Sequence, residues 1–567
     1  MLSDNNETLN PSVHHATPRS LKQALDEHCY VCNRFWEALD AEERDLITSP
    51  SMLKGKHVSV LASTIGEQYF FLIPQKVSVS ARADVQSQRL ALTTGSPETL
   101  SLAKRWVKEC TTCHHKCNQT VGEEPWYPTR LLTFDLNSLC IFQDQENLRD
   151  WEHEASLMGN VYAYSFCNIS AADVPDCSQS IFSNRDYRTI VPQEIELEVH
   201  DKKTKNSTKR FTLFDYKFWE SEVSNSLVNK RAWVLQERLL APRILHFGRR
   251  QLIWECGEKD AAEVYPNGLP INLSTSPSSR FKQLDSFDYT HRVVVYKNRD
   301  ADENSAPHLL WHRIVEQYTA ASLTVPGDKL IACSGVAKKL SGIIQDDYVA
   351  GMWRQYLEGE LLWMVRNTHQ LQPCTRAREY RAPSWSWASI DGPVSAGEPR
   401  TRDTMVVIED YHLDYCTSDK TGGICGGWIQ LRGDLKRAVL ERRGNEQDGG
   451  DNWVMVADEK KDDIFKGISA NGSEAIVKLD DPEEISPEDS SKGLLFYMCA
   501  RLPRGSGRNM YLLLLKLVDT KSGTFQRIGV AYARSEKVKG ARLEKTSTEE
   551  NLPCLRYEGG SHSIRII

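Results

Sequence analysis

Residues 139–170 contain two short apolar runs separated by an amphipathic segment, and this pattern constrains the fold more than any other feature of the chain. Leu139 to Phe142 has the length and composition of a buried strand. A helix is predicted from Arg149, with one apolar face formed by Trp151, Ala155, Met158 and Tyr162. A second strand is predicted over 165–170. Strand, helix and strand at this spacing predict a parallel pair joined by a right-handed crossover, and therefore an α/β core.

The chain of 567 residues is too long to fold around one core. Changes in hydrophobic pattern predict a disordered N-terminus (1–18), an α+β region (19–128), the α/β domain (129–275), a helical region ending in a tryptophan-rich segment (276–398) and a β-rich region (399–567).

Local signals predict further elements within these regions. They are a helix over 21–46, a hairpin of 57–62 with 68–73, a helix capped by Ser96, a helix over 231–240, a hairpin of 243–247 with 251–255, and helical stretches at 308–321, 328–344 and 347–358. The acidic segment 480–484 is expected to be a solvated connection.

Charge and hydropathy exclude several classes of function. The formal net charge is −7, from 70 Lys and Arg against 77 Asp and Glu, so nucleic-acid binding driven by phosphate neutralisation is not expected. No apolar run is long enough to span a bilayer, and the N-terminus does not resemble a secretory signal. We therefore expect a cytoplasmic protein whose 15 cysteines are reduced thiols or metal ligands.

Cysteine and histidine cluster at two places. Cys29 and Cys32 form a C-x-x-C, and the segment 110–117, CTTCHHKC, packs soft and borderline ligands into one short stretch. Thiolates and imidazoles are the ligands of tetrahedral zinc, so a bipartite zinc site is predicted from Cys29, Cys32, His114 and Cys117. The alternative is that these are buried free thiols on two packed helices.

Two charged segments are candidates for binding or catalysis. Trp151-Glu-His-Glu154 opens a helix near the carboxyl ends of the predicted strands, where α/β proteins place their sites. Alternatively, its carboxylates are only the acidic residues favoured in a first turn. A second cluster, of Arg231, Gln236, Glu237 and Arg238 around Trp233, suits either a phosphate-bearing ligand or a structural lock between helix and sheet. Cys140 and Cys256 are interpreted as core thiols.

The blocks SLCIFQDQENLRDWEHEASLMGNVYAYSFCNISA (138–171) and KRAWVLQERLLAPRILHFGRRQLIWECGEKDAAEVYPNGLP (230–270) resemble signature blocks of the fungal heterokaryon incompatibility (HET) domain. With its flanks the resemblance covers about 20–395. It implies non-self recognition and programmed cell death, with protein partners such as other HET proteins or a second copy.

The resemblance also implies a fold related to TIR domains, with a parallel sheet core. Some TIR domains cleave NAD with a glutamate on a helix, which implies Glu154 as the catalytic residue and NAD as substrate. The implied binding residues are Gln143, Asp144, Trp151, Arg231, Trp233, Gln236, Glu237 and Arg238.

One part of the family pattern is missing. The family has an opening strand and helices, and a strand similar to W-I-D before S-L-C-I, whereas here YPTRLL joins almost directly to SLCIFQD and Asn137 replaces the aspartate. An incomplete sheet is expected to leave apolar faces exposed and edge groups unpaired. A gene-model error and a real deletion both explain the gap. The chain is accordingly either an effector, enzymatic if intact, or a non-enzymatic regulator or decayed copy that modulates intact HET proteins.

Overall fold

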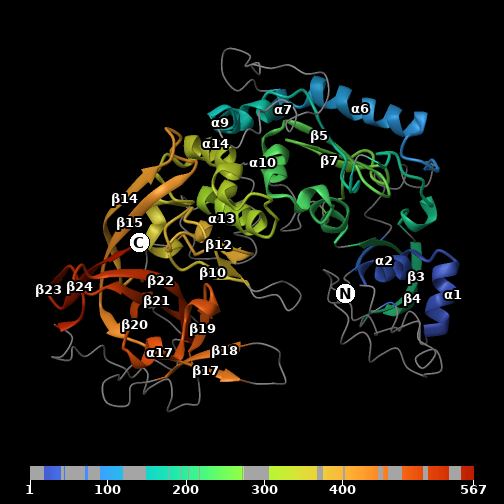
Figure 1. The fold of residues 1–567 in the computed structure, drawn as a ribbon. Helices are drawn as coiled ribbons and strands as arrows, with labels where there is room; N and C mark the ends of the chain where they lie inside the picture. Colours follow the sequence, from blue (N-terminus) through green and yellow to red (C-terminus); the bar gives the residue numbers. More distant parts are fainter. Residues whose placement is uncertain are drawn as a thin grey trace. The chain divides into compact units, whose positions relative to one another are not determined.

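The computed structural model describes residues 18–39, 44, 70–74, 90–118, 149–176, 178–192, 194–201, 204–215, 217–270, 273, 282, 306–366, 374–399, 403–444, 451–456, 475–501, 509–534 and 551–567. They belong to two compact units (Figure 1). Unit 1 comprises Met1–Pro125, Ala163–Lys230 and Ala241–Gln283, and unit 2 comprises Trp126–Tyr162, Arg231–Leu240 and Leu284–Ile567. The predicted strand over 139–142 lies outside the described residues.

The described residues of unit 1 include a four-stranded sheet in the order β2-β5-β6-β7. The strands are β2 (Asn168–Ser170), β5 (Arg243–Phe247), β6 (Leu252–Cys256) and β7 (Asp260–Ala262). β2 pairs with β5 in parallel, and β5, β6 and β7 follow one another antiparallel. The hairpin predicted over 243–255 is confirmed. The described strands therefore form a mixed sheet in an α/β arrangement, with one parallel pair.

Helices and loops of unit 1 cover both faces of this sheet. Trp254 points to the face covered by α6 (Pro97–Cys113), whose Trp106 ring lies 6.5 Å from the Trp254 ring. Its neighbour Ile253 points to the other face, where it packs with Phe218 and Trp219, as the alternation of side chains along a strand requires. Both faces of β5 to β7 are thus covered. At the β2 edge, however, Ile169 is 62% exposed.

Helix α6 begins where the sequence predicts. The Ser96 hydroxyl accepts a hydrogen bond from the Thr99 N–H at 3.2 Å, and Pro97 occupies the first turn. The buried positions of the helix include Ala103, Trp106 and Cys110, which carry its packing on the sheet. The helix ends at Cys113, and after His114 the short helix α7 (His115–Asn118) follows.

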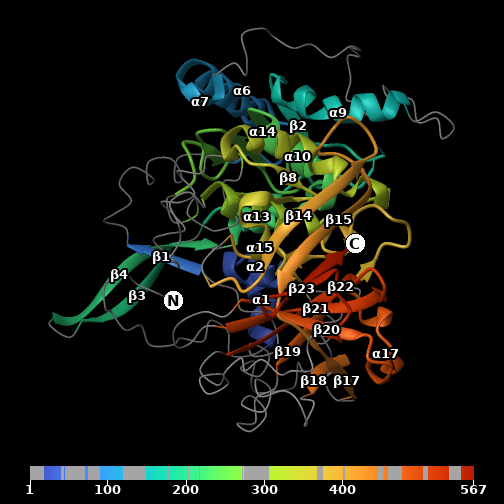
Figure 2. The ribbon, with the colours of Figure 1, turned by 90° about the vertical axis from the view of Figure 1, so that its left-hand side faces the viewer.

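The N-terminal part of unit 1 differs from expectation. The helix predicted over 21–46 is divided into α1 (Pro18–Asp26) and α2 (Tyr30–Ala38), because His28 between them has a φ of 60°. Strand β1 (Phe70–Pro74) pairs with β4 (Thr204–Asp215), which pairs with β3 (Glu194–Asp201) (Figure 2). The run 57–62, predicted to pair with β1, lies outside the described residues. Short turns complete the unit: η2 (Tyr187–Thr189), η3 (Glu220–Ser224) and η4 (Val228–Lys230).

Unit 2 contains the helices α9 (Arg149–Ala163, all but its last residue), α10 (Ala232–Leu240), α13 (Ala306–Thr319) and α14 (Ser334–Ile344). The predicted apolar face of α9 is confirmed, since Ala155, Met158 and Tyr162 are buried. The stretch 347–358 is not one helix. It forms β8 (Tyr348–Val349), β9 (Met352–Trp353), η8 (Arg354–Tyr356) and the start of α15 (Leu357–Glu360), because Ala350 and Gly351 have φ angles of 51° and 92° and reverse the chain.

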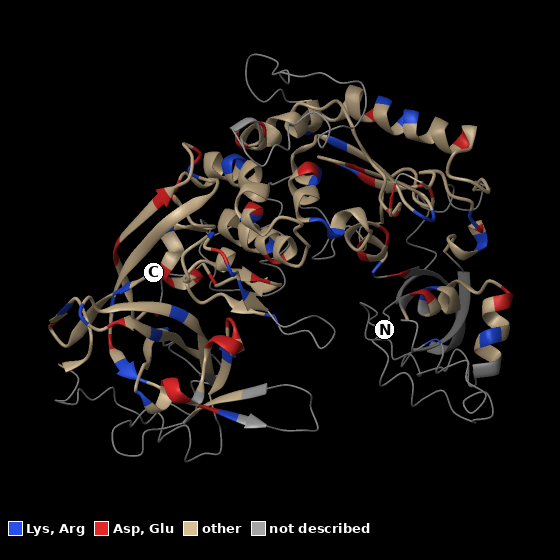
Figure 3. Cartoon of the chain, viewed as in Figure 1, with Lys and Arg blue, Asp and Glu red and all other residues tan. Residues whose placement is uncertain are grey.

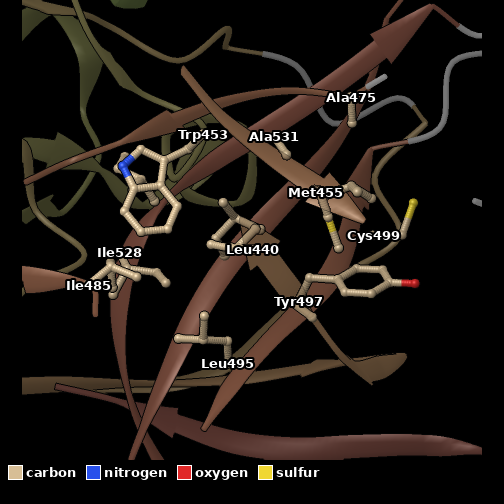
Figure 4. Packing of buried hydrophobic residues seen from close by; sticks show 14 of the residues in the cluster. Leu440, Trp453, Met455, Ala475, Ile485, Leu495, Tyr497, Cys499, Ile528 and Ala531 are labelled. Atoms are coloured by element: carbon tan, nitrogen blue, oxygen red, sulfur yellow. The ribbon is translucent and has the colours of Figure 1, made fainter. Parts of the chain in front are cut away.

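The β-rich character expected for the C-terminal part of the chain is confirmed, because its described strands form an eleven-stranded sheet. Its strands are β14 (Val407–Tyr415), β15 (Ile424–Gly433), β16 (Leu435–Arg437), β17 (Val439–Gly444), β18 (Asp451–Val456), β19 (Ile476–Leu479), β20 (Leu495–Arg501), β21 (Asn509–Asp519), β22 (Thr524–Arg534), β23 (Arg556–Glu558) and β24 (Ser561–Ile566). Alternate residues of β20 belong to one apolar cluster, in which Leu495, Tyr497 and Cys499 pack with Trp453 (Figure 4).

Shorter elements connect the helices of unit 2 to this sheet. They are η6 (Pro326–Lys329), η7 (Ile331–Cys333), β10 (Met364–Val365), β11 (Thr375–Arg376), η9 (Trp387–Ser389), β12 (Ile390–Asp391), β13 (Val394–Ser395), η10 (Pro482–Glu484) and α17 (Pro487–Ser491). In the tryptophan-rich segment, Trp385 and Trp387 are buried, and the indole of Trp387 donates to the Gly351 carbonyl at 2.8 Å.

Two expectations are wrong in the β-rich region. Asp480, which opens the acidic segment, is 1% exposed, and its carboxylate pairs with the buried guanidinium of Arg527 at 2.7 Å. That guanidinium also lies 3.4 Å from the centre of the Trp363 ring. Cys416 and Cys425 are joined by a disulfide, so they are neither reduced thiols nor metal ligands. Elsewhere, acidic and basic side chains are interspersed over the described elements (Figure 3).

Helices α9 and α14 approach each other at two glycines, which generates a stability prediction. A Cβ on Gly335 would lie 2.9 Å from the Gly159 Cα and 2.9 Å from the Gln236 Oε1, whereas a Cβ on Gly342 of the same helix would meet nothing within 4 Å. We expect Gly335→Ala to destabilise the protein by about 1–3 kcal/mol through overpacking. Gly342→Ala is expected to stabilise it by up to about 1 kcal/mol.

Urea denaturation followed by tryptophan fluorescence measures both variants. A midpoint for Gly335→Ala at or above that of Gly342→Ala would contradict the close approach of the two helices.

Candidate metal centre

Four side chains of unit 1 meet where α6 and α7 contact the end of β6. They are Cys110, His114, Cys117 and Cys256, and their ligand atoms all lie within 4.8 Å of one another. The Nδ1 atom of His114 lies 3.3 Å from the Cys256 sulfur and 3.9 Å from the Cys117 sulfur. A tetrahedral zinc ion with ordinary bond lengths would separate these nitrogen and sulfur atoms by about 3.6 Å. The four side chains therefore fit a tetrahedral ion.

Local geometry explains how three of these ligands come from one short segment. Cys110 lies on the last turns of α6, and the break at His114, with φ −90° and ψ 111°, redirects the chain before α7. Asn118 reinforces the break, because its side-chain amide donates to the His114 carbonyl at 2.8 Å and the Cys110 carbonyl at 3.0 Å. This change of chain direction places the Cys117 sulfur close to the Cys110 sulfur.

The fourth ligand comes from the turn that joins β6 to β7. Cys256 is the last residue of β6, and the Lys259 N–H donates to its sulfur at 3.3 Å. The Lys116 N–H donates to the Glu258 carboxylate at 2.6 Å, which ties α7 to the same turn. Backbone N–H groups that point at a sulfur stabilise its thiolate form, which is the form that binds a metal.

Burial and hydrogen bonding shift the thiol pKa values in opposite directions. The sulfur-bearing residues Cys110, Cys117 and Cys256 are 0%, 6% and 2% exposed. Hydrogen bonds from the Cys110 and Cys117 thiols, together with backbone N–H groups of Glu258 and Lys259, lower the pKa of Cys256. Hydrogen bonds of the Cys110 thiol with Cys117 and Cys256, together with burial, raise the pKa of Cys110. A metal ion that binds here would displace the protons that the sulfurs share.

The structure brings together only part of the predicted ligand set. His114 and Cys117 belong to the centre, but Cys29 and Cys32 do not close onto them. Instead Cys32 is 1% exposed and packs with Leu21, Ala24 and Leu39 between α1 and α2, with Cys29 against the same cluster. Their places are taken by Cys110, from the segment quoted above, and by Cys256, which sequence reasoning assigned to the core. The sequence Cys-Gly-Glu-Lys, in which a strand ends on the cysteine and a turn follows, is the signal that could have identified Cys256 as a ligand.

Residues of the second candidate cluster make packing contacts within unit 2. The Trp233 ring meets the Trp151 ring edge-on, with centres 6.4 Å apart, and its indole donates to the Asp328 carboxylate at 3.2 Å. The buried side chain of Gln236 accepts a hydrogen bond from the Gly335 N–H at 3.3 Å. Trp233 and Gln236 thus join α10 to its neighbouring helices.

The remaining candidates are distributed as follows. Glu154 on α9 and Glu237 on α10 are half-buried, and Arg238 is 5% exposed. Arg231, directly before α10, is exposed, and its backbone forms an isolated β-bridge with Ser322. Gln143 and Asp144 lie outside the described residues. Roles for these residues in binding or catalysis stay predictions. Among the described helices, none combines the length and apolarity needed to cross a membrane.

Comparison with known protein families gives a match to part of the chain. Residues 133–237 match the family model of the heterokaryon incompatibility protein (HET). The match begins upstream of the quoted block 138–171 and ends within α10. No curated protein and no solved structure matches the chain.

The centre predicts a specific dependence of metal content on cysteine position. We expect the purified chain to bind about one zinc ion, and Cys256→Ser to lose it, because zinc requires four ligands for a closed structural site. Cys113→Ser is the matched control, since Cys113 lies between two ligands but is exposed. Cys32→Ser tests the earlier ligand set and is expected to keep the ion.

Metal content is measured by elemental analysis after dialysis. Zinc loss in Cys32→Ser with retention in Cys256→Ser would contradict the structure and restore the set that includes Cys29 and Cys32.

Proposed function

We propose that this chain, which carries a heterokaryon incompatibility (HET) domain, acts in non-self recognition and cell-death signalling, and that zinc at the Cys110 centre holds its unit 1 together. The observation that carries the signalling role is the family match over 133–237. The match covers the whole block 138–171 and the start of the block 230–270, which supports the proposal because those blocks are long and specific in sequence.

The positions of the metal ligands support a structural role for zinc. Cys110, His114 and Cys117 precede the matched residues and Cys256 follows them. An ion bound to all four would close a long loop of chain and join α6 and α7 to β6, which follows the match. Closing a long loop removes conformational freedom from the unfolded chain, so the ion would stabilise unit 1.

We infer that signalling proceeds through protein contacts with other HET proteins or a second copy of the chain. The packing of Trp233 and Gln236 within unit 2 supports this mechanism, since two residues suited to a ligand already hold helices together. The chain then acts as an effector or as a partner that modulates complete HET proteins.

Cleavage of NAD with Glu154 as catalytic residue is the second candidate function. The observation in its favour is burial: Glu154 is half-buried on α9, whereas Glu152, two residues away, is exposed. A half-buried carboxylate is the type of group whose reactivity an enzyme can tune.

A growth assay tests the signalling role. We expect the chain, fused to an inducible dimerisation domain and expressed in a fungal host, to slow growth when dimerisation is induced. Cys256→Ser is expected to abolish the effect because unit 1 would lose its metal, while Cys113→Ser is expected to retain it. Normal growth of cells that express folded, dimerised wild-type chain would argue against the effector role. Unchanged toxicity of a co-expressed complete HET protein would argue against the modulating role.

The same strains separate the two mechanisms. If contacts carry the signal, Glu154→Gln is expected to remain toxic and cellular NAD to stay constant. If Glu154 cleaves NAD, induction is expected to deplete NAD in the wild type and in Glu152→Gln, the exposed control, but not in Glu154→Gln. NAD is measured in extracts by an enzymatic cycling assay.

A further inference from the structure

Arg243, the first residue of β5, lies beside the metal centre and is 6% exposed. Its Nε donates to the Cys110 sulfur at 3.3 Å, and its Nη2 donates to the Cys117 carbonyl at 3.1 Å and to the Asn118 side chain. Its Nη1 donates to the Phe166 carbonyl at 3.1 Å. One guanidinium thus contacts one ligand sulfur and the backbone of a second ligand.

Charge balance gives this contact its significance. Three thiolates and a neutral imidazole around a divalent ion carry a net charge of minus one. The three sulfurs are almost fully buried, and a buried net charge is costly unless an opposite charge accompanies it. Arginine stays protonated under all ordinary conditions, so Arg243 supplies a permanent positive charge at hydrogen-bonding distance. With a divalent ion the centre then has no net charge.

We propose that Arg243 is a positioning residue of the metal centre, which neutralises a divalent ion bound by three thiolates and fixes Cys110 and Cys117 in ligating geometry. The proposal rests on the metal occupancy proposed above. It also predicts selectivity: a monovalent ion such as Cu(I) on the same thiolates would leave one negative charge unbalanced, so the buried centre favours a divalent ion.

A purely structural role is the alternative. The bonds to the Cys117 carbonyl, Asn118 and the Phe166 carbonyl connect α7 to the segment before β2, and they do not require a metal. Only the bond to the Cys110 sulfur and the positive charge act on the ion itself. The two roles are therefore distinguished by measurements on the metal rather than by stability.

Metal titrations on the full chain test the proposal. Arg243→Gln removes the charge, Arg243→Lys keeps it without the forked donor, and Arg105→Gln is the matched control, because Arg105 on α6 donates to the Pro266 carbonyl away from the ligands. Zinc affinity is measured by competition with a chromophoric chelator. The thiolate-to-cobalt charge-transfer band is measured after titration with Co²⁺.

We expect Arg243→Gln to weaken zinc binding by about 10–100-fold, the usual cost of losing a residue that supports metal ligands. Its cobalt band is expected to move to lower energy, because a thiolate that loses a hydrogen bond is a stronger electron donor. Arg243→Lys is expected to be intermediate in both measurements, and Arg105→Gln to match the wild type.

Wild-type affinity and band position in Arg243→Gln would overturn the proposal, as would equal losses of affinity in the glutamine and lysine variants. If circular dichroism shows that Arg243→Gln does not fold, Arg243→Lys decides: a lysine variant identical to the wild type in both measurements overturns the proposal. Absence of cobalt or zinc binding by the wild type would instead refute the metal occupancy on which the inference rests.

Discussion

The packing of Trp106 against Trp254 is the interaction on which the rest of unit 1 depends. It places α6 on the sheet, and the indole of Trp106 fixes the helix further by donating to the Pro266 carbonyl at 2.7 Å. Cys110 lies one helical turn beyond Trp106 on the same face, so this packing brings it to the end of β6, where Cys256 lies. The apolar contact and the metal ligands thus form one continuous cluster. A metal ion held by these ligands would add directional bonds at the end of a core that apolar packing, which is non-directional, has already formed.

Unit 2 uses a different means of fixing polar groups in its interior. Arg527 and Asp480 are 0% and 1% exposed. The Arg527 Nη1 donates to the Asp480 carboxylate and its Nη2 to the Trp363 carbonyl, while the guanidinium lies over the Trp363 ring. Arg376 approaches the same aspartate at 3.6 Å. Buried ion pairs contribute little net stability, but removing one member leaves a costly charge, so such a group restricts which strands and loops can pack together.

Elements with local signals could be predicted from the sequence. The Ser96 cap, the apolar face of α9 and the hairpin of β5 and β6 depend on residues within a few positions of one another, and the structure confirms all three. Contacts between distant residues could not be predicted. His114 and Cys256 are 142 positions apart, and the C-x-x-C motif favoured Cys29 and Cys32 as the other ligands. Asp480 was predicted to be solvated because its neighbours are acidic, while Arg527, which pairs with its carboxylate in the interior, lies 47 positions later. The local hydrophobic pattern predicts which helices and strands form, whereas packing decides which of them contact one another.

The path of the chain through the two units has a consequence for synthesis in the cell. Unit 1 is assembled from three separate stretches, and the intervening residues Trp126–Tyr162 and Arg231–Leu240 belong to unit 2. The last ligand, Cys256, leaves the ribosome well after Cys117, and most of unit 2 follows later still. Unit 1 therefore cannot complete its core until its third stretch, Ala241–Gln283, has been made, and unit 2 cannot complete its core until the second half of the chain exists. Until then, apolar surfaces of α6 and α9 lack partners that are made later. Molecular chaperones bind such exposed apolar surfaces, so we expect unit 1 to close late in its own synthesis and unit 2 to fold only after most of the chain has left the ribosome.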